Sequence, residues 1–133
     1  MTNRSNIDAL LKKADEALKI EIVKNGIVDD GYDSAIAAFG PSVVLSGLMP
    51  ALAFYCTEKK HENSKTDKRK VVKAIACTLQ SKYSGWTDYS QLFKHCLNNQ
   101  SSIERLTTDI VDASVALKMM VRTYKIIDSH DKQ

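Results

Sequence analysis

Apolar residues recur every three or four positions along most of the chain, which is the spacing of one face of an α-helix. The first such segment runs from about residue 7 to residue 23. Asn6 can cap its N-terminus with a side-chain oxygen, and Gly26 can end it because glycine adopts a positive φ without a steric clash. A second helical segment follows Asp29, and Gly40-Pro41 is predicted to end it.

The segment from residue 43 to residue 55 is apolar on nearly every side. A helix without a polar face is usually buried all round, so this segment is predicted to form the centre of the core. Pro50 within it either occupies the first turn of a new helix or kinks a continuous one. The polar stretch 61–67 has no periodicity and predicts an exposed, mobile loop.

Two further helices are predicted in the second half of the chain, over residues 72–83 and 88–97. Gly85 lies just past the first of them, and Asn98-Asn99 breaks the second. The residues predicted to face inward are Val72, Ile75, Ala76, Leu79 and Tyr83 in the first helix, and Tyr89, Leu92, Phe93, Cys96 and Leu97 in the second.

The last segment has the most regular pattern. Ser101 and Glu104 have the spacing of a capping box at its start. The apolar positions that follow alternate steps of three and four: Ile103, Leu106, Ile110, Ala113, Leu117, Met120, Tyr124 and Ile127. This seam predicts one helix about 40 Å long, packed at a shallow angle against its neighbours. Without any strand-like alternation, the sequence predicts an all-α bundle of five to six helices with a long C-terminal helix.

Length and composition indicate the number of domains and the expected cellular compartment. A chain of 133 residues with 44% apolar residues suits one domain, over residues 1–133, with one core. The N-terminus has no apolar segment typical of a secretory signal, and no window approaches the roughly 20 apolar residues that span a bilayer. The three cysteines are widely spaced and are expected to be reduced thiols, which together with the missing signal favours a cytoplasmic protein.

The sequence contains no recognisable catalytic or metal-binding motif. Cys56 and His61 would project about 140° apart on a helix, His95 and Cys96 about 100° apart, and there is no C-x-x-C pair. Phosphate-binding glycine motifs, a zinc-protease signature and a nucleophile elbow are also absent. The prediction is therefore a protein that is not an enzyme and needs no metal or cofactor. A small helical enzyme using Cys96 with His95 stays as an alternative.

Charge is concentrated in one short stretch. The chain has a net charge of +3, but residues 58–73 alone carry +4, so the remainder is slightly acidic. Such a cluster suggests a polyanionic partner, although solvated surface charge would look the same. Two groups of basic residues are predicted to contact nucleic acid. Lys118, Arg122 and Lys125 are expected as one stripe opposite the apolar seam of the last helix. Lys68, Arg69 and Lys73 are expected on the middle helix, the one that contains Val72 and Ile75.

One apolar stretch resembles a known family. Residues 46–55, Ser-Gly-Leu-Met-Pro-Ala-Leu-Ala-Phe-Tyr, are similar to the signature of the small subunit of the Cmr (type III-B) CRISPR–Cas effector complex, and Lys59 and Lys60 follow at a fitting distance. The order of segments is also similar over nearly the whole chain. Tyr124 departs from the family pattern, because a tryptophan is more usual at this position.

This resemblance implies a non-catalytic subunit. Proteins of this kind stack head to tail in a filament beside the backbone subunits that bear the guide RNA, and they help to hold the guide–target duplex; cleavage belongs to the backbone subunit. The implied partners are the other Cmr subunits, guide RNA, target RNA and further copies of the chain, with no membrane. The alternative is a free-standing helical DNA-binding regulator, for which residues 92–97 are too short and apolar to make a good recognition helix.

Overall fold

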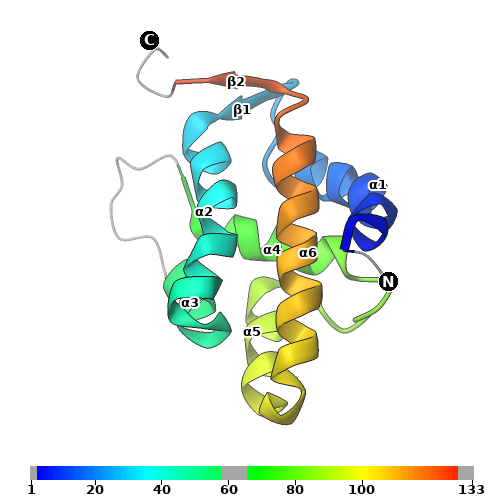
Figure 1. Cartoon of the computed structure of the whole chain (residues 1–133). Coiled ribbons are helices and arrows are strands. Elements are labelled where there is room, and N and C mark those ends of the chain that lie inside the picture. The colour runs from blue at the N-terminus through cyan, green and yellow to red at the C-terminus, as the bar shows by residue number, and fades with distance from the viewer. Residues whose placement is uncertain (1–2, 58–65, 129–133) are drawn as a thin grey trace.

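The computed structural model describes residues 3–57 and 66–128. The described elements are α1 (Asn3–Glu21), β1 (Ile27–Asp29), α2 (Asp30–Ser46), α3 (Leu48–Tyr55), α4 (Lys68–Thr78), α5 (Tyr89–Asn98), the short 3-10 helix η1 (Gln100–Ser102), α6 (Ile103–Val121) and β2 (Lys125–Ile127). Figure 1 shows them. The predicted all-α class with a long C-terminal helix is confirmed, and a two-stranded sheet adds to it.

Helix α6 is the central element of the fold. It packs against α1 on one side and α2 on the other, while α4 crosses behind it and also contacts α1 (Figure 1). Helices α3 and α5 lie together at one end of α6, and β1 pairs with β2 at the other. This arrangement follows from the α6 sequence, because small and branched apolar side chains recur on the faces turned to three neighbouring helices.

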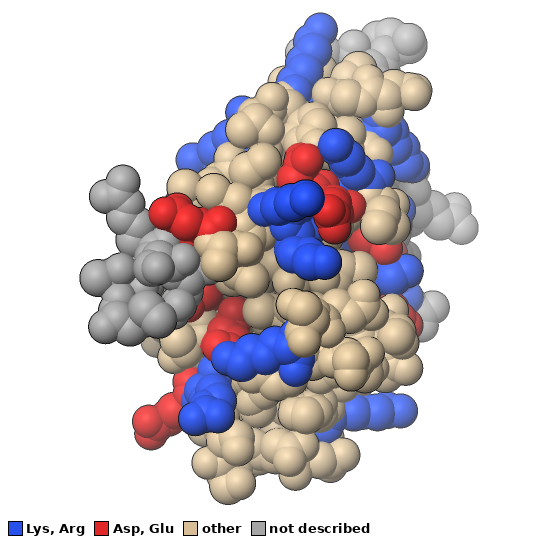
Figure 2. Space-filling model, turned by 90° about the vertical axis from the view of Figure 1, so that its right-hand side faces the viewer, with Lys and Arg blue, Asp and Glu red and all other residues tan. Residues whose placement is uncertain are grey.

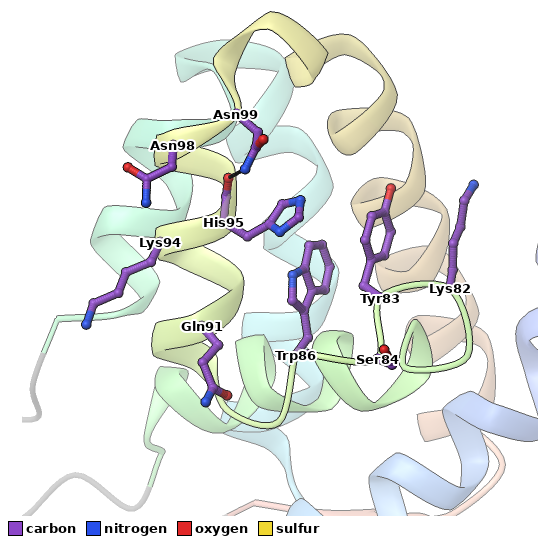
Figure 3. A pocket seen from close by; sticks show the side chains of 10 residues that line it. Lys82, Tyr83, Ser84, Trp86, Gln91, Lys94, His95, Asn98 and Asn99 are labelled. Carbon is purple, nitrogen blue, oxygen red and sulfur yellow. Dashed lines mark hydrogen bonds between the residues drawn. The ribbon is translucent and has the colours of Figure 1, made fainter.

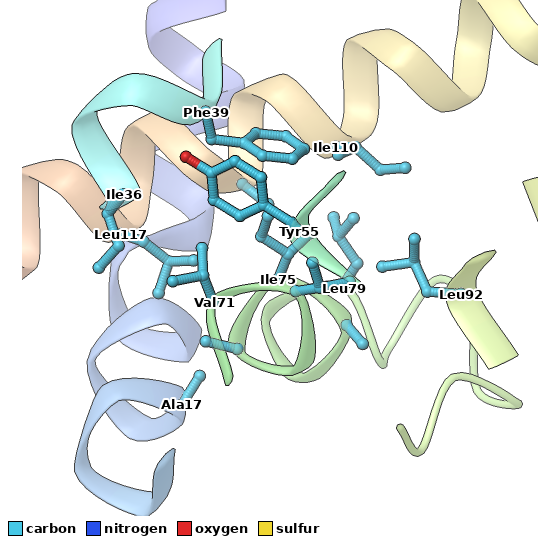
Figure 4. Close-up of a cluster of buried hydrophobic side chains, with 14 of the residues drawn as sticks. Ala17, Ile36, Phe39, Tyr55, Val71, Ile75, Leu79, Leu92, Ile110 and Leu117 are labelled. Atoms are coloured by element: carbon cyan, nitrogen blue, oxygen red, sulfur yellow. The ribbon is translucent and has the colours of Figure 1, made fainter. Parts of the chain in front are cut away.

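The core is one cluster to which every long helix contributes. Tyr55 lies at its centre, with its ring edge-on to Phe39 at a centroid distance of 5.1 Å and its hydroxyl donating to the backbone oxygen of Ala35 at 2.5 Å. Figure 4 shows Ile75 of α4 and Ile110 of α6 in the same cluster. The buried hydroxyl is thus hydrogen-bonded, which removes the cost of placing it in an apolar environment.

The segment predicted to be buried throughout is two helices with a mixed environment. Gly47, at φ +91°, separates α2 from α3, and Pro50 lies in the first turn of α3, one of the two predicted alternatives. Leu52 is fully buried, as predicted, but Val44 and Leu45 are 83% and 85% exposed. The prediction was therefore wrong for part of the segment, because an apolar sequence does not reveal which face meets the solvent.

Helix α2 does not end at Gly40-Pro41, as the sequence suggested. It continues through Pro41 to Ser46. A proline inside a helix removes one backbone donor, but Phe39 and Val43 on either side are buried on the core-facing side of the helix. Their burial outweighs the lost hydrogen bond, so the helix runs on to Gly47.

Several predicted helix ends are displaced. Helix α1 begins at Asn3, so Asn6 lies inside it, and it ends at Glu21, before the turn in which Gly26 adopts φ +76°. Helix α4 covers Lys68–Thr78, so it includes Arg69 and Lys73 as predicted but ends before Leu79 and Tyr83, which were expected on its buried face. Most of the predicted loop 61–67 lies outside the described residues.

The start of α6 also differs from the prediction. Ser101 belongs to η1, and the residue before the first helical position, Ser102, makes no side-chain capping bond, so the predicted capping box is wrong. Glu104 still lies in the first turn, where a carboxylate interacts favourably with the helix dipole. In α5, Leu92 and Cys96 are buried as predicted, whereas Leu97 is 47% exposed.

The predicted long helix stops early and the chain continues as a strand. Helix α6 ends at Val121 after 19 residues, which is about 28 Å and not 40 Å. β2 then pairs in parallel with β1, with Ile27 opposite Lys125 and Asp29 opposite Ile127. Strands of three residues are too short to show a two-residue alternation, so the sequence pattern could not reveal them.

Asp67 caps the N-terminus of α4. Its carboxylate accepts from the backbone N–H of Arg69 at 3.1 Å and from the Arg69 guanidinium at 2.9 and 2.8 Å. The hydrogen bond from Arg69 holds the pKa of Asp67 below its usual value. A carboxyl with a lowered pKa in the folded protein stabilises it above its unfolded pKa, and this contribution is lost as the pH falls through the folded pKa.

Replacing Asp67 with alanine should lower the free energy of unfolding by about 1 kcal/mol at neutral pH, because the cap is lost. The difference from wild type should begin to shrink below about pH 4, the usual carboxyl pKa, and should shrink further as the pH falls through the lower folded pKa of Asp67. Chemical denaturation at pH 7 and pH 3 measures both effects. Asp88→Ala is the matched control, because Asp88 precedes α5 without a side-chain capping bond. An equal loss in both variants would contradict the assigned role of Asp67.

Candidate nucleic-acid interface

The predicted basic residues at the start of α4 already interact with other parts of the molecule. The Nζ of Lys68 lies 4.4 Å from the centroid of the Phe54 ring on α3. Arg69 is paired with Asp67 at 2.8 Å, and its guanidinium lies 5.8 Å from the ring centroid of Tyr89 on α5. The hydrogen bond with Asp67 raises the pKa of Arg69 further above its already high value. These two cations thus join α4 to α3 and α5.

Lys73 faces a different neighbour. Its Nζ lies 3.2 Å from a carboxylate oxygen of Glu21, at the C-terminal end of α1. The hydrogen bond with Glu21 raises the pKa of Lys73, so the ammonium stays charged and paired. Arg69 and Lys73 lie one turn apart on α4, as predicted, but Arg69 contacts Asp67 and the α5 side while Lys73 pairs with α1.

The prediction of one stripe on the last helix is wrong, because its three members lie on different elements. Lys118 lies on α6, Arg122 directly follows the helix, and Lys125 belongs to β2. Arg122 pairs with Asp33 of α2 at 3.3 Å. Lys118 and Lys125 make no ion pair with any described residue, so these two stay available for an anionic partner.

Charges of both signs are mixed over the face that carries α1. Figure 2 shows Lys and Arg side chains there, interleaved with Asp and Glu. Mixed charge of this kind is typical of a solvated surface and produces no large field of one sign. The search for a nucleic-acid contact therefore turns to smaller sites where cations lie together without carboxylates.

One hollow fits that description, and the sequence analysis missed it. It has a volume of about 540 Å³ and lies between the α4–α5 loop and the outer side of α5 (Figure 3). The side chains around it are basic, amide, aromatic or hydroxyl, and none is acidic. The lining residues are Lys82, Tyr83, Ser84, Gly85, Trp86, Gln91, Lys94, His95, Asn98 and Asn99.

Aromatic rings form one wall of this hollow. Tyr83 and Trp86 are stacked, with centroids 4.1 Å apart and planes 8° apart, and His95 lies edge-on to both. The Tyr83 hydroxyl donates to Asp109 of α6 at 2.5 Å, and burial, more than this bond, raises the pKa of Tyr83. The wall is thus fixed to the long helix, and the phenol stays protonated.

No sequence pattern pointed to this site. Its residues come from a loop without periodicity and from the outer face of a short helix, and they meet only through the α4–α5 connection. Asn98-Asn99 was interpreted only as a helix break. The sole tryptophan of the chain, beside Tyr83 and close to a lysine-histidine pair, is the one compositional signal that could have drawn attention to it.

The thiols give no support to cysteine catalysis. Burial raises the pKa of Cys56 to about 11 and that of Cys96 to about 12, so both are protonated at neutral pH and are poor nucleophiles. Cys77 is half-buried, and all three are free thiols. Among residues 3–57 and 66–128 there is no group of three or more His, Cys, Asp or Glu side chains placed to hold a metal ion.

Residues 9–124 match the family described as CRISPR-associated protein (Cas_Cmr5). The chain belongs to the Cmr5 family. Cmr5 is the small subunit of the type III-B Cmr complex, so the resemblance found in the sequence is confirmed. Comparisons with curated proteins and with solved structures found no match.

Family membership makes this Cmr5 chain a subunit of the type III-B effector complex and implies association with other Cmr subunits and guide RNA. The family-like stretch, residues 46–55, covers the α2–α3 junction. The exposed apolar side chains around that junction, Val44, Leu45 and Phe54, are named here the junction surface. None of the helices in the described part of this Cmr5 combines the length and apolar character that crossing a membrane requires.

Proposed function

We propose that this Cmr5 is a non-catalytic, cytoplasmic subunit that stacks head to tail with its own copies beside the backbone subunits and helps them to hold guide and target RNA. The observation that carries the proposal is the family match over residues 9–124. The protonated state of Cys56 and Cys96 is consistent with a subunit that performs no nucleophilic chemistry.

The junction surface supports the stacking part of the proposal. Val44 and Leu45 are neighbouring, large apolar side chains that project almost wholly into solvent, and Phe54 is also largely exposed. Exposed apolar groups that lie close together are typical of protein contact sites. Head-to-tail stacking needs two different complementary surfaces on each copy, and the junction surface is the candidate for one of them.

The available cations support the RNA part. Contacts between lysine and phosphate supply affinity without reading sequence, which suits a complex whose specificity comes from base pairing with a guide. Lys118 and Lys125 are the predicted residues best placed for this role, because neither is paired with a described acidic residue. Lys68, Arg69, Lys73 and Arg122 could contribute only by exchanging their present partners for phosphate.

Reconstitution of the complex tests the proposal. Assembly from the other Cmr subunits and guide RNA should incorporate the chain, and complexes lacking it should hold target RNA more weakly. Changing Lys118 and Lys125 together to glutamate should leave assembly intact and weaken target binding, with a smaller difference at high salt, because fewer counterions are released. Target affinity at two salt concentrations measures this effect. A chain that stays outside the assembled complex would overturn the proposed function.

A further inference from the structure

We propose that the hollow between the α4–α5 loop and α5 binds one unpaired nucleotide of RNA, with its phosphate beside Lys94. This inference rests on the proposed RNA-holding function and assigns a site to it. The hollow's volume of about 540 Å³ lies within the usual range for small-ligand sites.

The charge of the lining selects an anion. Lys94 is exposed and makes no ion pair with a described residue, and the lining includes no carboxylate. Lys82 lies at the opposite end of the hollow and is paired with Asp109 of α6 at 3.0 Å (Figure 3). The unpaired ammonium of Lys94 is therefore the group that favours a phosphate.

The neutral groups of the lining offer both donors and acceptors: the NH₂ of Asn99 donates to the backbone oxygen of His95 at 2.8 Å, which leaves its amide oxygen to accept. The side-chain oxygen of Gln91 accepts from the backbone N–H of Thr87 at 2.9 Å and from its hydroxyl, which leaves the amide NH₂ of Gln91 to donate. The Asn98 amide is exposed at the rim. A lining with both donors and acceptors fits a nucleotide, whose phosphate, ribose and base carry groups of both kinds.

An unpartnered indole N–H gives a second, independent reason to expect a ligand. Trp86 is only 2% exposed, and its Nε1 has no hydrogen-bond partner within the described part of the chain. Figure 3 shows the ring in the wall of the hollow, with the nitrogen on the side turned toward α5. Buried donors in proteins are nearly always satisfied, so a movement of the lining that opens this nitrogen to the hollow would let a ligand supply the missing acceptor.

The aromatic wall favours an unpaired base over a duplex. His95 is half-buried and lies at the edge of the Tyr83–Trp86 stack, with centroids 5.7 and 5.4 Å away. A ring held in this way can take a base on its open side, as side chains commonly do in proteins that bind single-stranded RNA. A base in a duplex would first have to unpair and turn out of its helix before it could stack in the hollow.

Tryptophan fluorescence reads the site directly, because Trp86 is the only tryptophan of the chain. The full chain is titrated with a short single-stranded oligouridine RNA at low salt. Binding in the hollow should change the Trp86 emission, and Lys94→Glu should weaken the transition. Lys13→Glu, the same charge reversal at an exposed position of α1, should not. RNA binding without any change in emission would place the RNA elsewhere and overturn the assignment.

The assembled complex gives the second measurement, with wild-type, Lys94→Glu and Lys13→Glu chains. The Lys94→Glu complex should bind RNA more weakly than wild type. The ratio of the two affinities should fall about threefold between 50 and 200 mM salt, which is the change expected when one phosphate contact is lost. Binding is measured separately for guide RNA alone and for guide RNA with target RNA. The comparison identifies which strand supplies the nucleotide.

The outcomes separate this inference from the proposed function. If all three complexes assemble and bind RNA alike, the hollow is no RNA site, while the proposed function still stands. If Lys94→Glu alone fails to assemble, the hollow contacts protein and the assignment is wrong. If the wild-type chain does not join the complex, the proposed function itself fails.

Discussion

Replacing Leu52 with alanine should lower the free energy of unfolding by about 2–5 kcal/mol. Leu52 is fully buried on α3, within the cluster that holds Tyr55 and Ile75. Removing its side chain loses the transfer free energy of the buried methyl groups and leaves a cavity that tightly packed neighbours fill only partly. Equilibrium denaturation with urea measures the change, provided that the transition is cooperative.

Leu45→Ala is the matched control for that experiment. The substitution is chemically identical and lies in the same apolar segment, but Leu45 is exposed, so the expected change is within about 0.5 kcal/mol. The two variants together separate the buried face of the segment from its solvent face. Equal losses would mean that the α2–α3 junction is packed differently from the structure described here.

Replacing Val44 and Leu45 together with glutamate should prevent the chain from joining its complex while leaving the fold intact. Both side chains are exposed, so charge there costs the isolated domain little. In a desolvated contact, however, two unpaired carboxylates are strongly unfavourable, and hot-spot losses of 2 kcal/mol or more correspond to at least about 30-fold weaker binding. The measurement is co-assembly with the other Cmr subunits, alongside the circular dichroism spectrum and melting temperature of the isolated variant.

Ile20→Glu provides the comparison, since Ile20 is a large, exposed apolar residue on α1, away from the junction surface. This variant should assemble normally if the contact is local to the junction surface. Normal assembly of the Val44/Leu45 variant would show that the junction surface is merely solvent-exposed, and stacking would have to use another face.

The sequence predicted helices well wherever a helix has one buried face. The predicted apolar seam of α6 is confirmed at Leu106, Ile110 and Leu117, which are all buried. Packing between long helices requires apolar side chains at this spacing, so the sequence pattern reveals it. The pattern fails beyond Val121, since Tyr124 continues the spacing after the helix has ended. Its hydroxyl donates to Asp15 on α1, a contact between distant residues that no local pattern contains.

The basic residues show a second limit of sequence-based prediction. Their positions were read from helical geometry, but whether a lysine or arginine is available depends on its neighbours in space. Arg69, Lys73 and Arg122 each found an acidic partner, two of them on distant elements. Lys94, in contrast, carried no signal in the sequence and became a candidate only when the structure placed it beside a hollow without carboxylates.

The pairing of β1 with β2 has a consequence for how the chain folds. The two strands join positions near opposite ends of the sequence, and closing so long a loop costs entropy before the pairing returns any stability. Val28, fully buried in β1, therefore has no strand partner until residues 125–127 have been synthesised. The sheet should thus be among the last elements of this domain to form.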